Sequence, residues 1–174
     1  KFNPTEPSTI VNADGTPKVM YHGTRSENGE FYVFDETKAV KKGGFGLRAL
    51  GKGNYFTAKK LDGTEIYGSR VISAYLDIKK PFTYSGGGSF YEQVSNELNI
   101  DPQIDYDTLQ KKMRDLGYDG VIEYDANGGV SIAVVFDSNQ IKSATDNVGT
   151  FDSGNPDIRY SARDPEAQEV NRVL

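Results

Sequence analysis

The sequence contains no cysteine, no tryptophan and a single histidine among its 174 residues. Without cysteine the chain can form no disulfide framework, no zinc ribbon and no thiol nucleophile. One histidine cannot build a His-rich metal cluster, so metal-centred chemistry would have to rest on carboxylates alone, and a serine–histidine–carboxylate triad would have to use His22. We expect no metal. The chain also lacks a run of about 18 apolar residues, which a membrane span requires, and an apolar signal core near its start. We expect a cytoplasmic, monomeric protein that does not enter a membrane.

The composition that remains indicates one loop-rich and strand-rich domain, with 19 glycines and 11% aromatic residues. The net charge of −5 conceals an asymmetry, because residues 1–80 carry 13 basic and 9 acidic residues, whereas residues 81–174 carry 7 and 16. Between Lys38 and Lys60 there are seven basic residues and no acidic one. This stretch is either a solvated charged loop or a local anion site, and the acidic whole argues against broad nucleic-acid binding.

Short apolar segments separated by turn residues predict several strands and few helices. Gly23 is expected to stop the first strand, and Pro81 is expected to end the longest one. Five glycines within residues 41–53 indicate a loop, and because a strand follows it, the loop is neither a P-loop nor a dinucleotide fingerprint. The expected strands are residues 19–22, 31–34, 54–57, 71–78, 121–124, 130–136 and 141–144.

Two helices are predicted from capping signals and apolar stripes. The first begins after Ser89, which matches a capping box with Glu92, and its stripe comprises Tyr91, Val94 and Leu98. The second covers residues 106–116, with Asp105 as its N-cap and Gly117 just after its end. Its stripe comprises Leu109, Met113 and Leu116.

Six to eight strands, about two helices and no regular strand–helix–strand alternation predict an α+β fold built on antiparallel sheets. Residues 1–17 are interpreted as a leader and edge segment, residues 18–144 as the main domain, and residues 145–174 as a polar C-terminal extension or linker. Because the chain does not begin with methionine, we expect it to be a piece of a longer protein.

Three short patterns follow one another along the chain. They are Tyr-His-Gly-Thr at 21–24, Gly-Lys-Gly-Asn-Tyr-Phe-Thr at 51–57, and the apolar strand at 132–136 followed by Gln-Ile-Lys at 140–142. Each alone is weak, because a lone histidine or tyrosine in a strand most often belongs to the core or the surface. Together they resemble the ADP-ribosyltransferases of the poly-ADP-ribose-polymerase-like class, which carry a His-Tyr-Glu motif and are related to diphtheria toxin.

The ends of the chain narrow this resemblance. The lead-in at 12–17, the run at 139–144 and the tail at 149–152 are similar to a bacterial and phage subgroup found in large polyvalent proteins of mobile elements. The resemblance implies an ADP-ribosyltransferase-like catalytic domain over residues 18–144. The implied fold is a split antiparallel β-sandwich with a few short helices and an NAD-binding cleft.

The resemblance also implies NAD as co-substrate and assigns its contacts. His22 would hydrogen-bond a hydroxyl of the adenosine-side ribose, a task for a neutral imidazole, and the backbone of Gly23 would reach the nicotinamide carboxamide. Tyr55 and Tyr67 would enclose the nicotinamide ring, and the basic residues around Arg48 would lie near the pyrophosphate. The implied NAD-binding residues are His22, Gly23, Thr24, Arg48, Lys52, Tyr55, Phe56, Thr64 and Tyr67.

The sequence departs from the family motif at its third position, where the catalytic glutamate aligns with Ile132. Isoleucine cannot hydrogen-bond a ribose hydroxyl or orient an acceptor, and core packing also accounts for its presence in an alternating strand. In relatives with this replacement polymer extension is lost; some transfer a single ADP-ribose and others are inactive. Glu123, Ser131 and Gln140 are near in sequence, but we expect Glu123 to face the site only if the hairpin register slips.

The resulting hypothesis is an NAD-dependent mono-ADP-ribosyltransferase with a His22-Tyr55-Ile132 motif. It would transfer one ADP-ribose to a macromolecular acceptor with release of nicotinamide, as a bacterial or phage toxin or effector. The acidic net charge favours a protein over a nucleic acid as acceptor, whose identity stays open. The alternatives are a non-catalytic NAD- or ADP-ribose-binding module of a larger mobile-element protein, an interaction domain with a degenerate pocket and, more distantly, a tRNA 2′-phosphotransferase.

Overall fold

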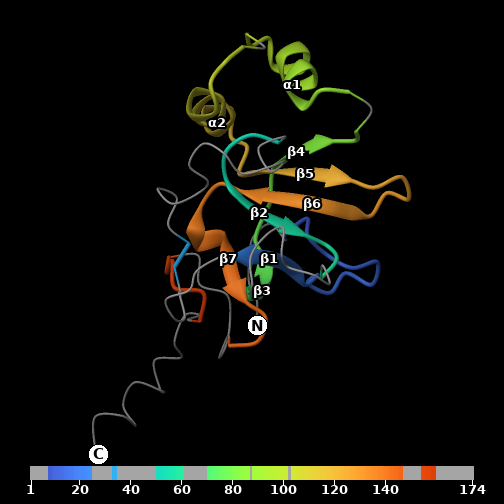
Figure 1. The fold of residues 1–174 in the computed structure, drawn as a ribbon, viewed down its shortest axis with the longest axis vertical. Helices are drawn as coiled ribbons and strands as arrows, with labels where there is room; N and C mark the ends of the chain where they lie inside the picture. The colour runs from blue at the N-terminus through green and yellow to red at the C-terminus, as the bar shows by residue number, and fades with distance from the viewer. Residues whose placement is uncertain are drawn as a thin grey trace, which may run out of the picture.

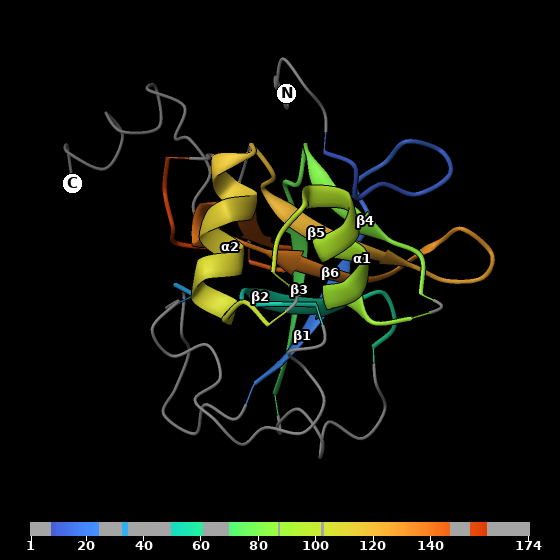
Figure 2. The same ribbon diagram turned by 90° about the horizontal axis from the view of Figure 1, so that it is seen from above.

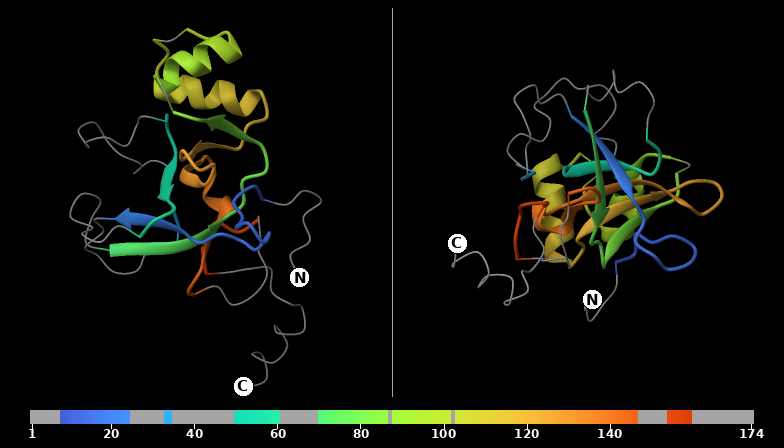
Figure 3. Two further views of the ribbon diagram at one scale, coloured as in Figure 1. Left: turned by 90° about the vertical axis from the view of Figure 1, so that its right-hand side faces the viewer. Right: turned by 90° about the horizontal axis from the view of Figure 1, so that it is seen from below.

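The computed structural model describes residues 8–24, 33–34, 50–60, 70–86, 88–101, 103–146 and 154–159. The described residues form one curled, mixed sheet in the order β4-β5-β6-β2-β1-β3-β7 (Figure 1). The strands are β1 (Met20–Thr24), β2 (Asn54–Thr57), β3 (Arg70–Leu76), β4 (Pro81–Tyr84), β5 (Gly120–Tyr124), β6 (Val130–Val135) and β7 (Ile141–Ser143). Helices α1 (Phe90–Leu98) and α2 (Tyr106–Asp115) lie beyond β4, at one end of the curled sheet (Figures 1 and 3). The α+β class predicted from the sequence is confirmed.

One pair of strands breaks the expected antiparallel arrangement. β4 and β5 run parallel, while the other neighbouring strands run antiparallel. The two helices lie between these strands in the chain and provide the long crossover that a parallel pair requires. The prediction that Pro81 ends the longest strand is wrong, because β3 already ends at Leu76. Pro81 instead begins β4, a position where the missing N–H of proline is tolerated.

The first strand is longer than predicted. β1 continues through Gly23 to Thr24, because its pairing with β3 extends to Gly23↔Val71 and Thr24↔Arg70. The prediction that Gly23 stops the strand is therefore wrong. Of the expected strand at 31–34, residues 31 and 32 lie outside the described residues, and Val33 forms an isolated bridge with Asp157. Most of the expected loop at 41–53, up to residue 49, also lies outside them.

The two helices show how well local signals predict their ends. In α2 the Asp105 side chain accepts a hydrogen bond from the Thr108 backbone N–H at 2.9 Å, and Gly117 has a φ of +86°, so both predicted ends are confirmed. In α1 the predicted capping box is wrong, because the Ser89 side chain makes no capping hydrogen bond to any described residue. The stripe of α2 is also shorter than expected, since Leu116 is 50% exposed.

Each face of the sheet carries its own apolar core, as the alternation along β6 requires. Val134 belongs to the core beneath the helices, whereas Ala133 and Val135 belong to the core on the other side. We call these the helix-side face and the opposite face. The helix-side core is covered by α1 and α2, which Figure 2 shows over the sheet. Its members are Leu50, Phe82, Phe90, Val94, Ile100, Leu109, Met113, Val121, Val134 and Phe136.

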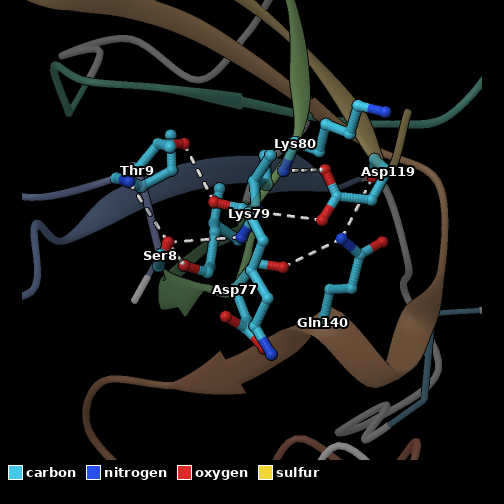
Figure 4. Close-up of polar contacts among 10 residues, drawn as sticks. Ser8, Thr9, Asp77, Lys79, Lys80, Asp119 and Gln140 are labelled. Carbon is cyan, nitrogen blue, oxygen red and sulfur yellow. Dashed lines mark hydrogen bonds and ion pairs between the residues drawn. The ribbon is translucent and has the colours of Figure 1, made fainter. Parts of the chain in front are cut away.

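A polar junction fixes the passage from β3 to β4 (Figure 4). The Asp119 carboxylate accepts hydrogen bonds from the backbone N–H groups of Lys79 at 2.7 Å and Lys80 at 2.9 Å. Gln140 donates through Nε2 to the carbonyl oxygens of Asp77 at 2.9 Å and Asp119 at 3.0 Å. Because these side chains satisfy backbone groups where the ladder is interrupted, the junction holds the curled end of the sheet together.

Segments from both ends of the chain pack against the sheet. Ser8 donates through Oγ to the Leu76 carbonyl at 2.7 Å, and the Thr9 N–H donates to the Ile78 carbonyl at 2.7 Å (Figure 4). Near the other end, the Ser143 N–H donates to the carbonyl of the buried Ile158 at 2.8 Å. No helix among the described residues has the length and apolar character that a membrane crossing demands.

Candidate active site

His22 lies on β1 and is held by the backbone of the neighbouring strand. Its Nδ1 atom lies 2.7 Å from the carbonyl oxygen of Tyr55 on β2. A carbonyl oxygen only accepts hydrogen bonds, so Nδ1 carries the proton and, in the neutral ring, Nε2 keeps a free lone pair. Burial lowers the pKa of His22 below its ordinary value of about 6.5, and the hydrogen bond to Tyr55 opposes this shift only in part. The ring is therefore neutral at pH 7 and has one defined tautomer.

Two aromatic rings fix the orientation of this imidazole. Phe34 meets it edge-on, with ring centroids 5.0 Å apart, and Phe56 lies tilted beside it at 5.3 Å. Phe56 is completely buried on the opposite face of the sheet. Phe56 was expected among the NAD-binding residues, and the structure places it as packing beneath His22.

The position of His22 coincides with a split in the sheet. β1 and β2 pair at a single described position, Tyr21↔Thr57. Continuing this register would place Gly23 opposite Tyr55, but the Tyr55 carbonyl is instead bound by the His22 ring. Gly23 remains paired with β3 on its other side. The split therefore leaves the backbone of Gly23 next to the imidazole without a ladder to β2 at the described positions.

Tyr55 projects from the other face of the sheet. It lies opposite Val134 on β6, and its ring packs against the helix-side core. Its hydroxyl donates to the Gly51 carbonyl at 2.5 Å and accepts from the Leu50 N–H at 3.2 Å. These bonds close the turn that leads into β2. A side chain at Gly53 would clash with β6, since an added Cβ would lie 2.5 Å from the Val134 side chain.

Lys52, one of the basic residues expected near a pyrophosphate, is tied to helix α2. Its ammonium group forms an ion pair with Asp107, and its backbone carbonyl accepts a hydrogen bond from Gln110 Nε2 at 3.1 Å. Sequence reasoning missed this pairing because the two charges are 55 residues apart and no local spacing connects them. Thr24 lies at the end of β1 opposite Arg70. Arg48, Thr64 and Tyr67 lie outside the described residues.

Ile132 occupies β6 on the same face as Tyr55. It lies opposite Thr57 on β2 and opposite Glu123 on β5. Residues directly opposite each other in an antiparallel ladder project to the same face. Glu123 therefore shares the face of Ile132 in the native register, and the expectation that the register would have to slip is wrong.

A β-bulge explains the error. Near the turn Tyr124 pairs with Val130, but one residue earlier Glu123 pairs with Ile132, so one extra residue lies on β6 between these two pairs. Without that residue Glu123 would lie opposite Ser131 and would point to the other face. The Ser131 carbonyl accepts a hydrogen bond from the Ala58 N–H at 2.9 Å. Gln140, the third residue near the motif in sequence, is committed to the polar junction.

The donor set at these positions fits NAD in part. A neutral imidazole with a free Nε2 lone pair suits a ribose hydroxyl, and a glycine backbone at a split in a sheet suits a carboxamide. Ile132 has no polar side-chain atom and cannot hydrogen-bond NAD through its side chain. No cluster of three or more metal-ligating side chains occurs in the described parts of the chain.

Comparison with known proteins assigns the chain to a family. A family model described as ADP-ribosyltransferase in polyvalent proteins matches residues 12–151, a range that includes all the candidate residues from His22 to Ile132. None of the curated proteins compared with the chain gives a significant match.

Proposed function

Since the chain belongs to the family of ADP-ribosyltransferases in polyvalent proteins, we propose that it is an NAD-dependent mono-ADP-ribosyltransferase. It would transfer one ADP-ribose from NAD to a macromolecular acceptor and release nicotinamide. The observation that carries the proposal is the single tautomer of His22, with Nδ1 bound to the Tyr55 carbonyl and Nε2 left as the acceptor nitrogen of the neutral ring. A hydrogen-bond acceptor that is fixed before the ligand arrives needs no reorganisation on binding.

The proposed mechanism depends on positioning. Bound NAD would supply the chemistry, because its nicotinamide is already a cationic leaving group. His22 would accept a hydrogen bond from a ribose hydroxyl through Nε2, and the Phe34 and Phe56 rings would keep that acceptor in place. The Gly23 backbone would orient the carboxamide. Tyr55 would present an aromatic ring beside a turn that its own hydroxyl closes.

The acceptor in this proposal is a protein, acted on in a cytoplasm by a monomeric enzyme. The acidic net charge of −5 supports a protein because a polyanionic nucleic acid would be repelled over much of the surface. Phage origin and a toxin or effector role follow from the resemblance of the chain ends and belong to the same proposal.

A second function, NAD or ADP-ribose binding without turnover, is favoured by one observation. Ile132 is an apolar residue packed against the helix-side core, at the position where the family motif has a carboxylate. A site that lost its catalytic charge could keep the binding groups around His22.

The experiment is incubation of the chain with NAD labelled in both the nicotinamide and the adenosine. We expect release of nicotinamide and transfer of adenosine label to protein, and we expect His22→Ala and Tyr55→Ala to abolish both. Tyr106→Ala, at the exposed start of α2, serves as a control for loss of a tyrosine. Binding of NAD in calorimetry without nicotinamide release over hours would establish the binding module instead. Full activity in both site variants would refute the assignment.

A further inference from the structure

The seven strands described contain one carboxylate, that of Glu123 on β5. Glu123 is half-buried and lies on the helix-side face, directly opposite Ile132. Tyr55 lies on the same face, two residues along β2 from Thr57, the other neighbour of Ile132. The strands therefore place a single negative charge beside the position where the family motif has one.

The strand neighbours of Glu123 do not bond its carboxylate. On the β4 side it lies opposite Tyr84, whose hydroxyl donates to the Gly88 carbonyl. Beyond Ile132, the Thr57 hydroxyl donates to the Lys59 carbonyl at 3.0 Å. No ion pair or hydrogen bond to the Glu123 side chain occurs among the residues the structure describes. A half-buried carboxylate that no described residue binds gains no stabilisation from those residues, so its place on this face is consistent with another role.

We infer that Glu123 is the catalytic carboxylate of this site and that it acts across Ile132. Opposed residues of neighbouring strands have Cβ atoms about 4.5–5.5 Å apart, so a glutamate side chain that leans along the ladder brings its carboxylate over Ile132. The bulge between Glu123 and Tyr124 fixes the register that makes this reach available. The catalytic carboxylate would then come from β5, opposite the position on β6 where the family motif has it, and on the same face of the sheet.

The inference rests on the proposed function, and the step it adds is balanced. The bond between the ribose carbon and the nicotinamide nitrogen breaks, and its electron pair leaves with nicotinamide. A bond forms from the acceptor oxygen or nitrogen to that carbon, and the acceptor proton passes to the Glu123 carboxylate. Negative charge beside the carbon that loses a leaving group stabilises the transition state, and the apolar Ile132 strengthens this effect by excluding water.

The test compares nicotinamide release by the wild-type chain, Glu123→Gln and the double variant Glu123→Gln/Ile132→Glu. Glu123→Gln keeps the shape of the side chain and removes its charge. We expect kcat to fall roughly 10²-fold or more, with little change in the KM for NAD. The double variant returns a carboxylate to the opposed position, and we expect it to recover most of the loss. Glu92→Gln, an exposed residue of α1, is the matched control and should behave as wild type.

The outcomes separate the inference from the proposed function. An active wild type with equal activity in Glu123→Gln overturns the role of Glu123 and leaves the proposed function standing. A wild type that releases no nicotinamide overturns both. A loss in Glu123→Gln that the double variant does not recover, in variants whose melting temperature matches wild type, assigns Glu123 a structural role and also overturns the inference.

Discussion

The two ends of the candidate site are built in opposite ways. At the histidine end, comprising His22, Phe34 and Phe56, the half-buried imidazole packs against two buried rings on the opposite face and is hydrogen-bonded to a backbone carbonyl. At the carboxylate end, comprising Glu123 and Ile132, both side chains are half-buried on the helix-side face beside a bulge. A hydrogen bond and two ring contacts fix the His22 side chain, whereas no described residue bonds the Glu123 carboxylate.

This difference shows which parts of a site can change without loss of the fold. Replacing the histidine would remove a hydrogen bond and a packed ring at once, so structure and function constrain it together. At Ile132 an apolar residue satisfies the packing of β6, and the fold imposes no requirement for charge there. A family motif can therefore stay intact at one end and lose its polar member at the other.

We expect the two ends of the site to differ most in what they contribute to the free energy of unfolding. Phe56→Ala removes a fully buried ring from beneath His22 and should lower the free energy of unfolding by about 3–5 kcal/mol. Ile132→Ala, at a half-buried position, should cost no more than about 2 kcal/mol. Urea unfolding of both variants measures the difference. An equal loss of unfolding free energy in the two variants would contradict the view that the histidine end is packed more tightly than the carboxylate end.

The next largest effect is on activity at the histidine end. His22→Asn keeps an N–H donor near the position of Nδ1 and loses the acceptor at Nε2, so nicotinamide release should fall about 10²-fold. His22→Ala should lose the same activity and also more stability, because it removes the bond to the Tyr55 carbonyl as well. Rates and melting temperatures of the two variants separate the roles of the two ring nitrogens. Undiminished activity in His22→Asn would show that Nε2 has no part in the reaction.

A smaller effect is expected at Tyr55, which lies on the helix-side face. Tyr55→Phe removes the hydroxyl that bonds Gly51 and Leu50 and should lower the free energy of unfolding by about 1 kcal/mol. Tyr118→Phe, at a half-buried position outside the site, is the control and should change stability by less. Identical unfolding curves for Tyr55→Phe and wild type would mean that the turn does not depend on this hydroxyl.

The smallest effect concerns pH. The pKa of His22 is lower in the folded chain than its ordinary value, so the unfolded chain takes up the proton first as the pH falls. The contribution of His22 to stability is complete above about pH 6.5 and is lost as the pH falls from there toward the lowered pKa. Unfolding free energies of wild type and His22→Asn between pH 5 and 8 test this. The difference between the two should shrink toward acid, and a constant difference would contradict the lowered pKa.

Local signals in the sequence predicted much of the fold. The strand Asn54–Thr57 matches the prediction residue for residue, and the cap at Asp105 follows from its spacing to Thr108. The sequence does not predict β4, because proline is typical of the end of a strand rather than of its interior. The parallel pair follows from a crossover that residue patterns do not specify. Capping at Ser89 failed because a matching residue pair does not ensure the side-chain bond.

The site was harder to predict than the fold. The motif gives the order of His22, Tyr55 and Ile132 along the chain. It does not predict the hydrogen bond between His22 and the Tyr55 backbone carbonyl, because that bond depends on how β1 and β2 lie side by side. The position of Glu123 depends on one extra residue in a hairpin, and a shift of one residue exchanges the two faces of a strand. Such register information arises from pairing in three dimensions.

The most direct test of this account is nitrogen-15 NMR of the imidazole, because the chain has one histidine and therefore one ring to observe. We predict a neutral ring with its proton on Nδ1 and a free Nε2 at pH 7, and we predict that NAD shifts the Nε2 resonance while Nδ1 keeps its proton. A proton on Nε2, or a spectrum that saturating NAD leaves unchanged, would contradict the role assigned to His22.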